Sequence, residues 1–388
     1  MDSTRDQFVK VASPQVGKEE VAAVREVLLS GQYVSGSKVK EFERLFADYI
    51  GVKYAVAVNS GTAALQAALM AIGVGAGDEV IVPALTFFST ATSVIHQNAV
   101  PVFADISLDN YCMDPADFER RITPRTKAVI PVHYFGHAVE MDRINEIAAT
   151  YCIKVIEDCA QSHGTLYKGQ QTGAMGDLGA FSFFATKHMT TGEGGAITTN
   201  NPEWAELMKQ FRSHGMKGRN DHILLGYNHR MTEMAGAMGI VQLGKLDALN
   251  EARIRVSEAL IERLEDIPWL TLPQVPNHVR HTYFWLHAWI DEEKLGFSTQ
   301  ELIARLREKK VEVRYRYLEP LYRQRLLQLD NPYCPFNGLP YRGMGIPAYD
   351  EMYLPNAEKV AGHIIGLPNR PDMKADEVEW VSEVLHTF

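Results

Sequence analysis

The sequence predicts an α/β protein with a mostly parallel central sheet, helices on both faces of that sheet, and a smaller C-terminal α+β domain. The first observation is that strand-like apolar runs alternate with helical patterns over the first part of the chain. The second is that this alternation stops after about residue 235. The third is that 388 residues, 46% of them hydrophobic, can bury a large core. We expect a large domain over residues 1–250, N-terminal segment included, and a small one over 251–388.

The strands expected in the large domain are short and apolar. They cover residues 54–58, 79–83, 100–106, 128–133, 153–157, 179–184 and 195–199. Helical patterns cover residues 63–70, 86–96, 114–122 and 139–151. This order favours parallel neighbouring strands. The last two strands are joined by a span around Lys187 that is too short for a helical crossover, so one of them should be antiparallel.

The C-terminal part has a different pattern. A long helix is expected over residues 231–265, then a strand at 282–290, a helix at 298–309, a strand at 311–317 and a helix at 374–386. At the end of the second strand, Arg316 or Tyr317 is expected near a binding site. The loop 331–350 holds Tyr333, Tyr341 and Tyr349. These tyrosines either pack on a sugar or anchor the loop, and the sequence leaves both alternatives open.

Lys187 follows the expected strand 179–184, and Ser182 precedes it by five residues. A lysine amine at the end of a sheet strand can form a Schiff base with the aldehyde of pyridoxal 5′-phosphate (PLP). A nearby serine hydroxyl can hold the phosphate of that cofactor. The pair therefore indicates PLP chemistry, although the same spacing also arises in unrelated chains, where the lysine is a solvated surface charge.

Asp158 ends the expected strand 153–157, 29 residues before Lys187, which suits a connection between neighbouring strands. A carboxylate at this place can pair with the protonated pyridine nitrogen of PLP and keep the ring cationic. Upstream, strand 54–58, the turn 59–62 and helix 63–70 form an anion site, because free amides at a helix start face the ligand.

The linked set of motifs resembles the DegT/StrS family of PLP-dependent sugar aminotransferases, which belongs to the fold-type I (aspartate aminotransferase) superfamily. The resemblance covers nearly the whole chain. It rests on the segments 30–36, 39–43, 60–62, 77–83, 86–87, 157–161, 186–187, 192–195, 226–231, 355–358 and 367–368.

The resemblance implies a role for each matching residue. Lys187 would form the Schiff base and move the proton, and Asp158 would pair with the pyridine nitrogen. Gln161 would bond the ring hydroxyl, and Phe87 would stack on the ring. The remaining contacts would be to the phosphate, from Gly61, Thr62 and Ser182 and, across the dimer, from Asn228 of the other subunit. The role of Arg230 stays open.

The resemblance also implies the reaction. Glutamate would give its amino group to a keto-sugar, expected to be a nucleotide-linked keto-deoxysugar, by a ping-pong mechanism that serves polysaccharide or antibiotic biosynthesis. The alternatives are a cyclitol aminotransferase, a PLP-dependent sugar dehydratase, and a non-catalytic PLP-fold regulator. Relatives that dehydrate carry histidine in place of the lysine. Here the lysine is present and His188 merely follows it, which favours amination.

Composition excludes several other classes. A formal net charge of −9 argues against a nucleic-acid binder, and no apolar run approaches the ~20 residues of a membrane span. The N-terminus has no signal-peptide pattern, and the four cysteines form no C-x-x-C pair, so we expect a cytoplasmic protein. The homodimer with shared active sites is implied by the family resemblance of the segment 226–231. No histidine lies in a metal-binding spacing, and we expect no metal.

Overall fold

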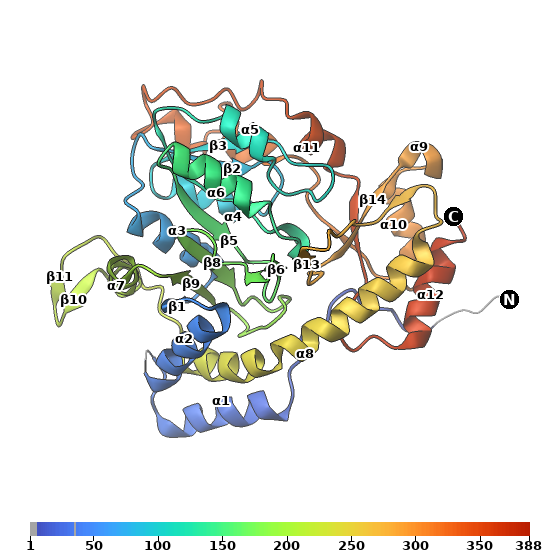
Figure 1. Cartoon of the computed structure of the whole chain (residues 1–388), viewed down its shortest axis with the longest axis horizontal. Coiled ribbons are helices and arrows are strands. Elements are labelled where there is room, and N and C mark those ends of the chain that lie inside the picture. The colour runs from blue at the N-terminus through green and yellow to red at the C-terminus, as the bar shows by residue number, and fades with distance from the viewer. Residues whose placement is uncertain (1–5, 35) are drawn as a thin grey trace.

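The computed structural model describes residues 6–34 and 36–388, and it shows a larger and a smaller region joined by one long helix (Figure 1). Residues 1–5, on which part of the signal-peptide argument rests, lie outside the described residues. So does Ser35, which belongs to the first segment of the family resemblance.

The larger region is built on a seven-stranded sheet in the order β1-β9-β8-β5-β4-β2-β3. The strands are β1 (Tyr54–Val58), β2 (Glu79–Pro83), β3 (Val100–Ala104), β4 (Thr126–Val129), β5 (Lys154–Asp158), β8 (Leu178–Ser182) and β9 (Gly195–Thr199). β9 is antiparallel to both of its neighbours, and all other pairs are parallel. The mostly parallel sheet and its antiparallel strand next to Lys187 are therefore confirmed.

Helices cover both faces of this sheet, as predicted. They are α2 (Ser37–Ile50), α3 (Gly61–Ala71), α4 (Ser89–Ile95), α5 (Pro115–Arg120), α6 (Met141–Thr150) and α7 (Pro202–Phe211). The helix α1 (Lys18–Ser30) lies outside this layer and packs on the long helix α8 (Glu233–Leu264). Successive residues of β1 point to opposite faces, so Val56 packs in the core cluster that contains α3, while Ala57 packs in the cluster that contains α2. The helices α1 and α2 were not expected as elements from the sequence.

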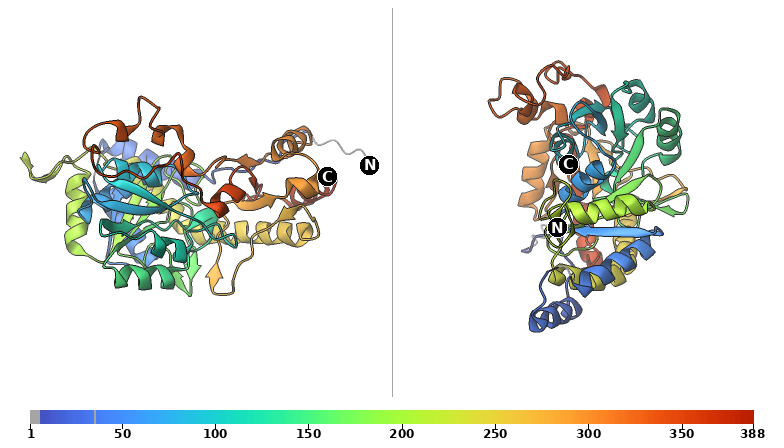
Figure 2. Two further views of the ribbon diagram at one scale, coloured as in Figure 1. Left: turned by 90° about the horizontal axis from the view of Figure 1, so that it is seen from above. Right: turned by 90° about the vertical axis from the view of Figure 1, so that its left-hand side faces the viewer.

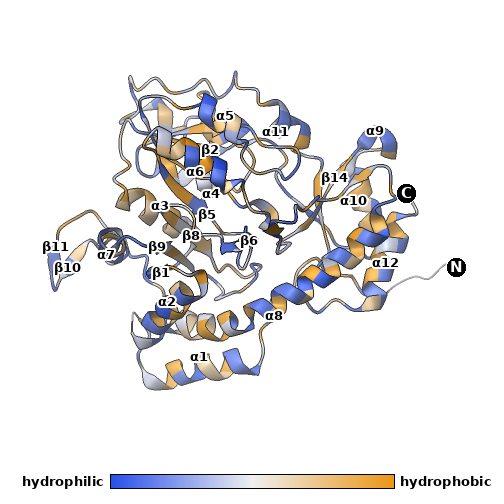
Figure 3. Ribbon diagram, viewed as in Figure 1, coloured by the Kyte–Doolittle hydropathy of each residue, from blue (hydrophilic) through white to orange (hydrophobic). Residues whose placement is uncertain are grey.

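The long helix α8 (Glu233–Leu264) has 32 residues and starts at Thr232, whose hydroxyl accepts a hydrogen bond from the backbone N–H of Ala235. Figure 3 shows hydrophobic and hydrophilic residues alternating along α8, which contacts α1 and α2 at one end and α12 at the other. Because α8 passes the residue 250 boundary, the division into 1–250 and 251–388 stays a proposal.

The smaller region has a four-stranded antiparallel sheet in the order β12-β14-β16-β15. Its elements are β12 (Leu270–Thr271), β14 (Leu286–Ile290), α9 (Glu292–Leu295), α10 (Thr299–Glu308), β15 (Arg314–Tyr315), β16 (Ile364–Leu367) and α12 (Ala375–Leu385). The helix α11 (Pro355–Val360) precedes β16 but packs on the core of the larger region. The strands expected at 282–290 and 311–317 are both shorter than predicted. The physical reason is backbone conformation, since Tyr283 and Tyr317 have φ values of 46° and 62°, which an extended strand does not allow.

The remaining elements are short. A three-stranded sheet contains β6 (Leu166–Tyr167), β7 (Gln170–Gln171) and β13 (Val279–Arg280). Short 3-10 turns cover Tyr134–Gly136, Leu321–Arg323, Arg325–Leu327 and Pro335–Asn337. The hairpin of β10 (Met216–Gly218) and β11 (Asp221–His222) projects from the body of the protein (Figures 1 and 2).

The loop 331–350 is anchored on the larger region by two of its tyrosines. Tyr341 and Tyr349 are each 3% exposed. Their hydroxyls donate hydrogen bonds to the backbone oxygens of Ile95 and Pro101. Tyr333 is exposed, so of the two alternatives the anchoring role holds for Tyr341 and Tyr349. Within residues 6–34 and 36–388, no helix combines the length and the apolar character that crossing a membrane requires.

Candidate active site

The carboxyl ends of the parallel strands β5 and β8 meet at one edge of the central sheet, and a cavity of about 770 Å³ opens there. Parallel sheets bind ligands at this edge, because the loops that leave neighbouring strands diverge there. The cavity is lined by Asp158, Ser182 and Lys187 from this edge, and the smaller region contributes Phe284, Trp285 and the segment 312–317. Arg316 and Tyr317, which the sequence expected near a site, line it as well.

Lys187 lies in the connection between β8 and β9, where its backbone N–H donates to the carbonyl of Phe184. Its Nζ is 4.4 Å from the ring centre of Phe284. Burial lowers the pKa of Lys187 to about 8, with Asp158 opposing the shift and Arg314 and Arg316 adding to it. About a tenth of the amine is then neutral at pH 7, and only the neutral amine can attack a carbonyl carbon.

Asp158 is 5% exposed. One carboxylate oxygen accepts a hydrogen bond from the Thr90 hydroxyl at 3.0 Å, and the other accepts one from the backbone N–H of Ala160 at 3.1 Å. Burial raises the pKa of Asp158, while these two hydrogen bonds and the charge of Lys187 act in the opposite direction. A cationic partner in the cavity would therefore stabilise the ionised form of this buried carboxylate.

The start of α3 and the end of β8 form a close cradle at the cavity wall. The Ser60 hydroxyl accepts a hydrogen bond from the backbone N–H of Ala63, which caps the helix and leaves the amides of Gly61 and Thr62 at its N-terminus. A Cβ added at Gly61 would lie 2.7 Å from Cβ of Ser182. Glycine is therefore required at position 61 for the helix start to approach the serine.

Gln161 and Phe87 also line the cavity. The side-chain oxygen of Gln161 accepts from the backbone N–H of Phe135 at 3.0 Å, so its amide nitrogen points towards the Tyr317 hydroxyl, 3.4 Å away. Phe87 is 55% exposed, an unusual state for a phenylalanine inside a core-forming segment, and it offers a flat apolar face to the cavity.

The sequence interpretation missed several residues of the site. Thr90 bonds Asp158, Phe284 and Trp285 form an aromatic wall, and Val11 and Ala12 reach the cavity from the N-terminal segment. The aromatic run 283–285 was a visible signal. Thr90 gave none, because its role depends on its distance from Asp158 in space.

Asn228, which the resemblance expects at the phosphate of the other subunit, is exposed and does not line the cavity of its own chain. Arg230 does not line it either. His188 is 2% exposed and its Nε2 lies 3.3 Å from the carbonyl oxygen of Thr282, so it is a buried neighbour of Lys187.

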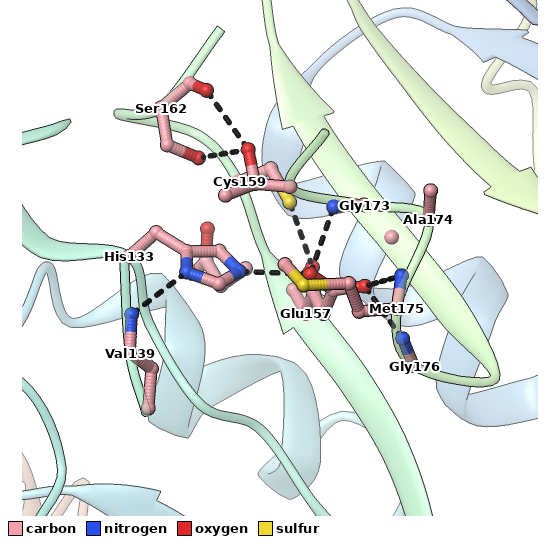
Figure 4. Close-up of polar contacts among 12 residues, drawn as sticks. His133, Val139, Glu157, Cys159, Ser162, Gly173, Ala174, Met175 and Gly176 are labelled. Carbon is pink, nitrogen blue, oxygen red and sulfur yellow. Dashed lines mark hydrogen bonds and ion pairs between the residues drawn. The ribbon is translucent and has the colours of Figure 1, made fainter. Parts of the chain in front are cut away.

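His133, Glu157 and Cys159 are buried together behind the site (Figure 4). His133 accepts the backbone N–H of Val139 at Nδ1, so its Nε2 donates to Glu157 at 2.9 Å. The Glu157 carboxylate also accepts three backbone N–H groups of the turn 173–176 at 2.7–2.8 Å. These lone pairs are already engaged, so the group holds the turn under β5 and does not offer a metal site.

The cavity residues fit PLP by their chemistry. Three features lie around this cavity: the half-buried Lys187 with its lowered pKa, the buried carboxylate of Asp158, and the close approach of Gly61 to Ser182, which leaves no room for a Cβ at position 61. They match, in turn, the aldehyde, the ring nitrogen and the phosphate of the cofactor.

Comparisons with known proteins agree with this geometry. The model of the DegT/DnrJ/EryC1/StrS aminotransferase family matches residues 14–386. The spore coat polysaccharide biosynthesis protein SpsC of Bacillus subtilis is 37% identical over 397 aligned positions, which cover 99% of this chain and 98% of SpsC.

Two solved structures have the same fold. DesV of S. venezuelae is 32% identical with a TM-score of 0.84, over 95% of this chain and 94% of DesV. A GDP-4-keto-6-deoxymannose-3-dehydratase, ColD, is 26% identical with a TM-score of 0.85, over 98% of this chain and 100% of ColD. The chain therefore belongs to the DegT/DnrJ/EryC1/StrS family, and it is a PLP-dependent aminotransferase of fold-type I.

Proposed function

We propose that this enzyme moves the amino group of glutamate to a nucleotide-linked keto-deoxysugar by a ping-pong mechanism. The observation that carries the proposal is the cavity of about 770 Å³ that both Lys187 and Asp158 line. That volume is in the range of pockets that hold whole small-molecule ligands, and one shared cavity suits two substrates that enter in turn.

Each residue has a proposed part in this reaction. PLP, when bound, supplies the electron sink that lowers the energy of a carbanion at the substrate carbon. Lys187 would bond the aldehyde carbon of the cofactor and, once the donor amine has displaced it, would take the proton from the donor carbon at Nζ. Its lowered pKa suits both tasks, because the same amine must be neutral to accept that proton.

The other residues would hold the cofactor. The Asp158 carboxylate would face the ring nitrogen and Gln161 the ring hydroxyl, while Phe87 would cover one face of the ring. Gly61, Thr62 and Ser182 would donate to the phosphate. All of these residues line the same cavity, which supports these assignments.

Borohydride reduction tests the assignment of Lys187. Purified enzyme should be yellow, lose its absorbance band on reduction, and carry the reduced cofactor on the peptide that contains Lys187. Lys187→Ala should fold and bind the cofactor without covalent attachment. A label on another lysine would refute the assignment.

A panel of keto-sugars with glutamate as donor tests the substrates. Transfer of the glutamate nitrogen to a nucleotide-linked sugar supports the proposal, and transfer to a cyclitol ketone alone would replace it. The dehydratase among the solved relatives makes loss of water from the sugar the second candidate. Sugar dehydration without nitrogen transfer would favour that candidate, and a protein that binds PLP but turns over neither substrate would be a regulator.

We further propose a homodimer in which Asn228 reaches the phosphate of the partner subunit. Asn228 is exposed and next to the projecting β10–β11 hairpin, and a phosphate gains from donors on more than one side. Mixing inactive Lys187→Ala with an inactive Asn228→Asp should restore part of the activity, because a heterodimer regains one intact site. Heterodimers that form and stay inactive would contradict shared sites.

We place the enzyme in the cytoplasm. All four cysteines, Cys112, Cys152, Cys159 and Cys334, are free thiols, which supports a reducing compartment.

A further inference from the structure

A small lobe of about 20 Å³ extends the main cavity beside Lys187. Both spaces share Lys187, Phe284 and Arg314, so the lobe opens where the reacting amine lies. Besides Lys187, three arginines line it, and two of them, Arg253 from α8 and Arg314 from β15, come from different elements.

Neither of these two arginines has a carboxylate partner within salt-bridge distance among the described residues. Arg253 donates to the side-chain oxygen of Asn250 at 3.2 Å. Arg314 lies over the rings of Phe284 and Trp285, at 5.3 and 5.2 Å from their centres. The third arginine of the lobe, Arg370, is different, because it makes two hydrogen bonds to Glu377.

Neighbouring cations disfavour the charge of both unpaired arginines. Burial lowers the pKa of each guanidinium to about 10, and the charge of Arg314 adds to the shift of Arg253 while that of Arg316 adds to the shift of Arg314. Two desolvated cations without an anion are unfavourable, whereas a carboxylate between them would receive several charge-assisted hydrogen bonds. The lobe therefore has the properties of an anion site that is completed by a ligand.

We propose that Arg253 and Arg314 bind the α-carboxylate of the amino donor; this inference rests on the proposed function. The donor amine must reach the place of the Lys187 amine, and its α-carboxylate is only two bonds away from that amine. The same two bonds separate the carboxylate from the nitrogen in every α-amino acid. Lys187 and Arg314 lie over the same Phe284 ring, which puts a cation within that short reach.

A sugar nucleotide also carries an anion, its phosphate, but the lobe suits it poorly. A space of about 20 Å³ holds one or two water molecules, and so a carboxylate head but not a diphosphate. The diphosphate of the acceptor fits the open main cavity, with its volume of about 770 Å³.

The experiment measures donor binding by the holoenzyme with 2-methylglutamate, which has no α-proton to lose, so a titration of cofactor absorbance reports binding alone. Arg253→Gln should raise the dissociation constant about 10- to 100-fold, the loss of a hydrogen bond to a charged group. Arg255→Gln is the matched control, because Arg255 is exposed and lies two residues further along α8. It should leave the constant unchanged.

Half-reaction rates with two donors identify the group that is bound. The Arg253→Gln penalty should be present with glutamate and absent, within about twofold, with 4-aminobutyrate, which lacks the α-carboxylate. Equal penalties with both donors would overturn the proposal. Arg314→Gln should show the same selectivity, and it replaces Arg253→Gln if that variant does not fold. A penalty confined to the KM of the sugar nucleotide would assign the lobe to phosphate instead.

Failure of the proposed function can be told apart from failure of this inference. If wild-type enzyme does not react with glutamate, the proposed donor is wrong. Alanine and ethylamine then make the same comparison, because they differ only in the α-carboxylate. If the wild-type enzyme treats these two amines equally, the lobe does not bind a carboxylate.

Discussion

Replacing Thr90 by valine tests how the protein supports the buried carboxylate of Asp158. The Thr90 hydroxyl donates to Asp158 at 3.0 Å inside a site where Asp158 is 5% exposed. Valine has nearly the same shape as threonine, and it removes this donor together with the longer contact of the Thr90 hydroxyl to the Thr86 hydroxyl at 3.5 Å. The substitution therefore leaves one carboxylate oxygen without its side-chain partner.

The size of the effect follows from the charge of the acceptor. A hydrogen bond to an ionised group contributes about 1.5–3 kcal/mol, so its loss should raise the pKa of Asp158 in the apoenzyme further. Burial already raises this pKa above its value in the unfolded chain. A carboxyl group with a raised pKa binds its proton more readily in the folded protein than in the unfolded chain. The ionised carboxylate of Asp158 therefore lowers the unfolding free energy at high pH, and this loss decreases as the pH falls through the folded pKa.

The assay is chemical denaturation of the apoenzyme of wild type and Thr90→Val between about pH 8 and pH 5. The difference in unfolding free energy should be about 1.5–3 kcal/mol at the upper end and should approach about 1 kcal/mol where Asp158 is protonated, because a neutral hydrogen bond contributes less. In the holoenzyme the same variant should slow the glutamate half-reaction about tenfold, since the carboxylate holds its charge less well.

Thr92→Val is the control, because Thr92 lies on the same helix, is half buried, and makes no side-chain hydrogen bond among the described residues. If Thr90→Val and Thr92→Val have the same pH dependence, or if the half-reaction of Thr90→Val is normal, the hydrogen bond does not support the charge of Asp158.

Three further outcomes are expected. Gly61→Ala should weaken PLP binding about tenfold in a cofactor titration, because the new Cβ would lie 2.7 Å from Cβ of Ser182, while Gly75→Ala, which would meet no atom within 4 Å, should not. Burial lowers the pKa of His287 to about 3, and unfolding exposes this imidazole to water, where it takes up a proton near pH 6.5. Stability should therefore fall by up to about 1.4 kcal/mol per unit as the pH drops from about 6.5 towards 3, and His287→Gln should flatten this slope in acid denaturation followed by circular dichroism. Glu157→Gln should lower the unfolding free energy by about 3 kcal/mol, because an amide nitrogen cannot accept from the turn 173–176; an unchanged denaturation midpoint would show that the turn is held by other contacts.

The sequence by itself determined that strands and helices alternate in the large domain, and that the residues expected to act on the cofactor lie at strand ends. Asp158 and Lys187 were predicted at strand ends from apolar runs that stop at polar residues, and β5 and β8 are indeed parallel neighbours. The short span around Lys187 also required an antiparallel β9, because a parallel pair needs a long crossover. These features depend on residues that are close in the chain, which is why a single sequence carries them.

Only the tertiary structure decided which distant residues complete the site. Thr90 bonds Asp158 across 68 positions, and Arg253 shares a lobe with Arg314 although α8 and β15 belong to different parts of the chain. Likewise Tyr341 and Tyr333 lie in the same loop, yet one is buried against Ile95 and the other is exposed. Each of these outcomes depends on packing between remote segments, whose energy is set by the whole fold and leaves no local pattern in the sequence.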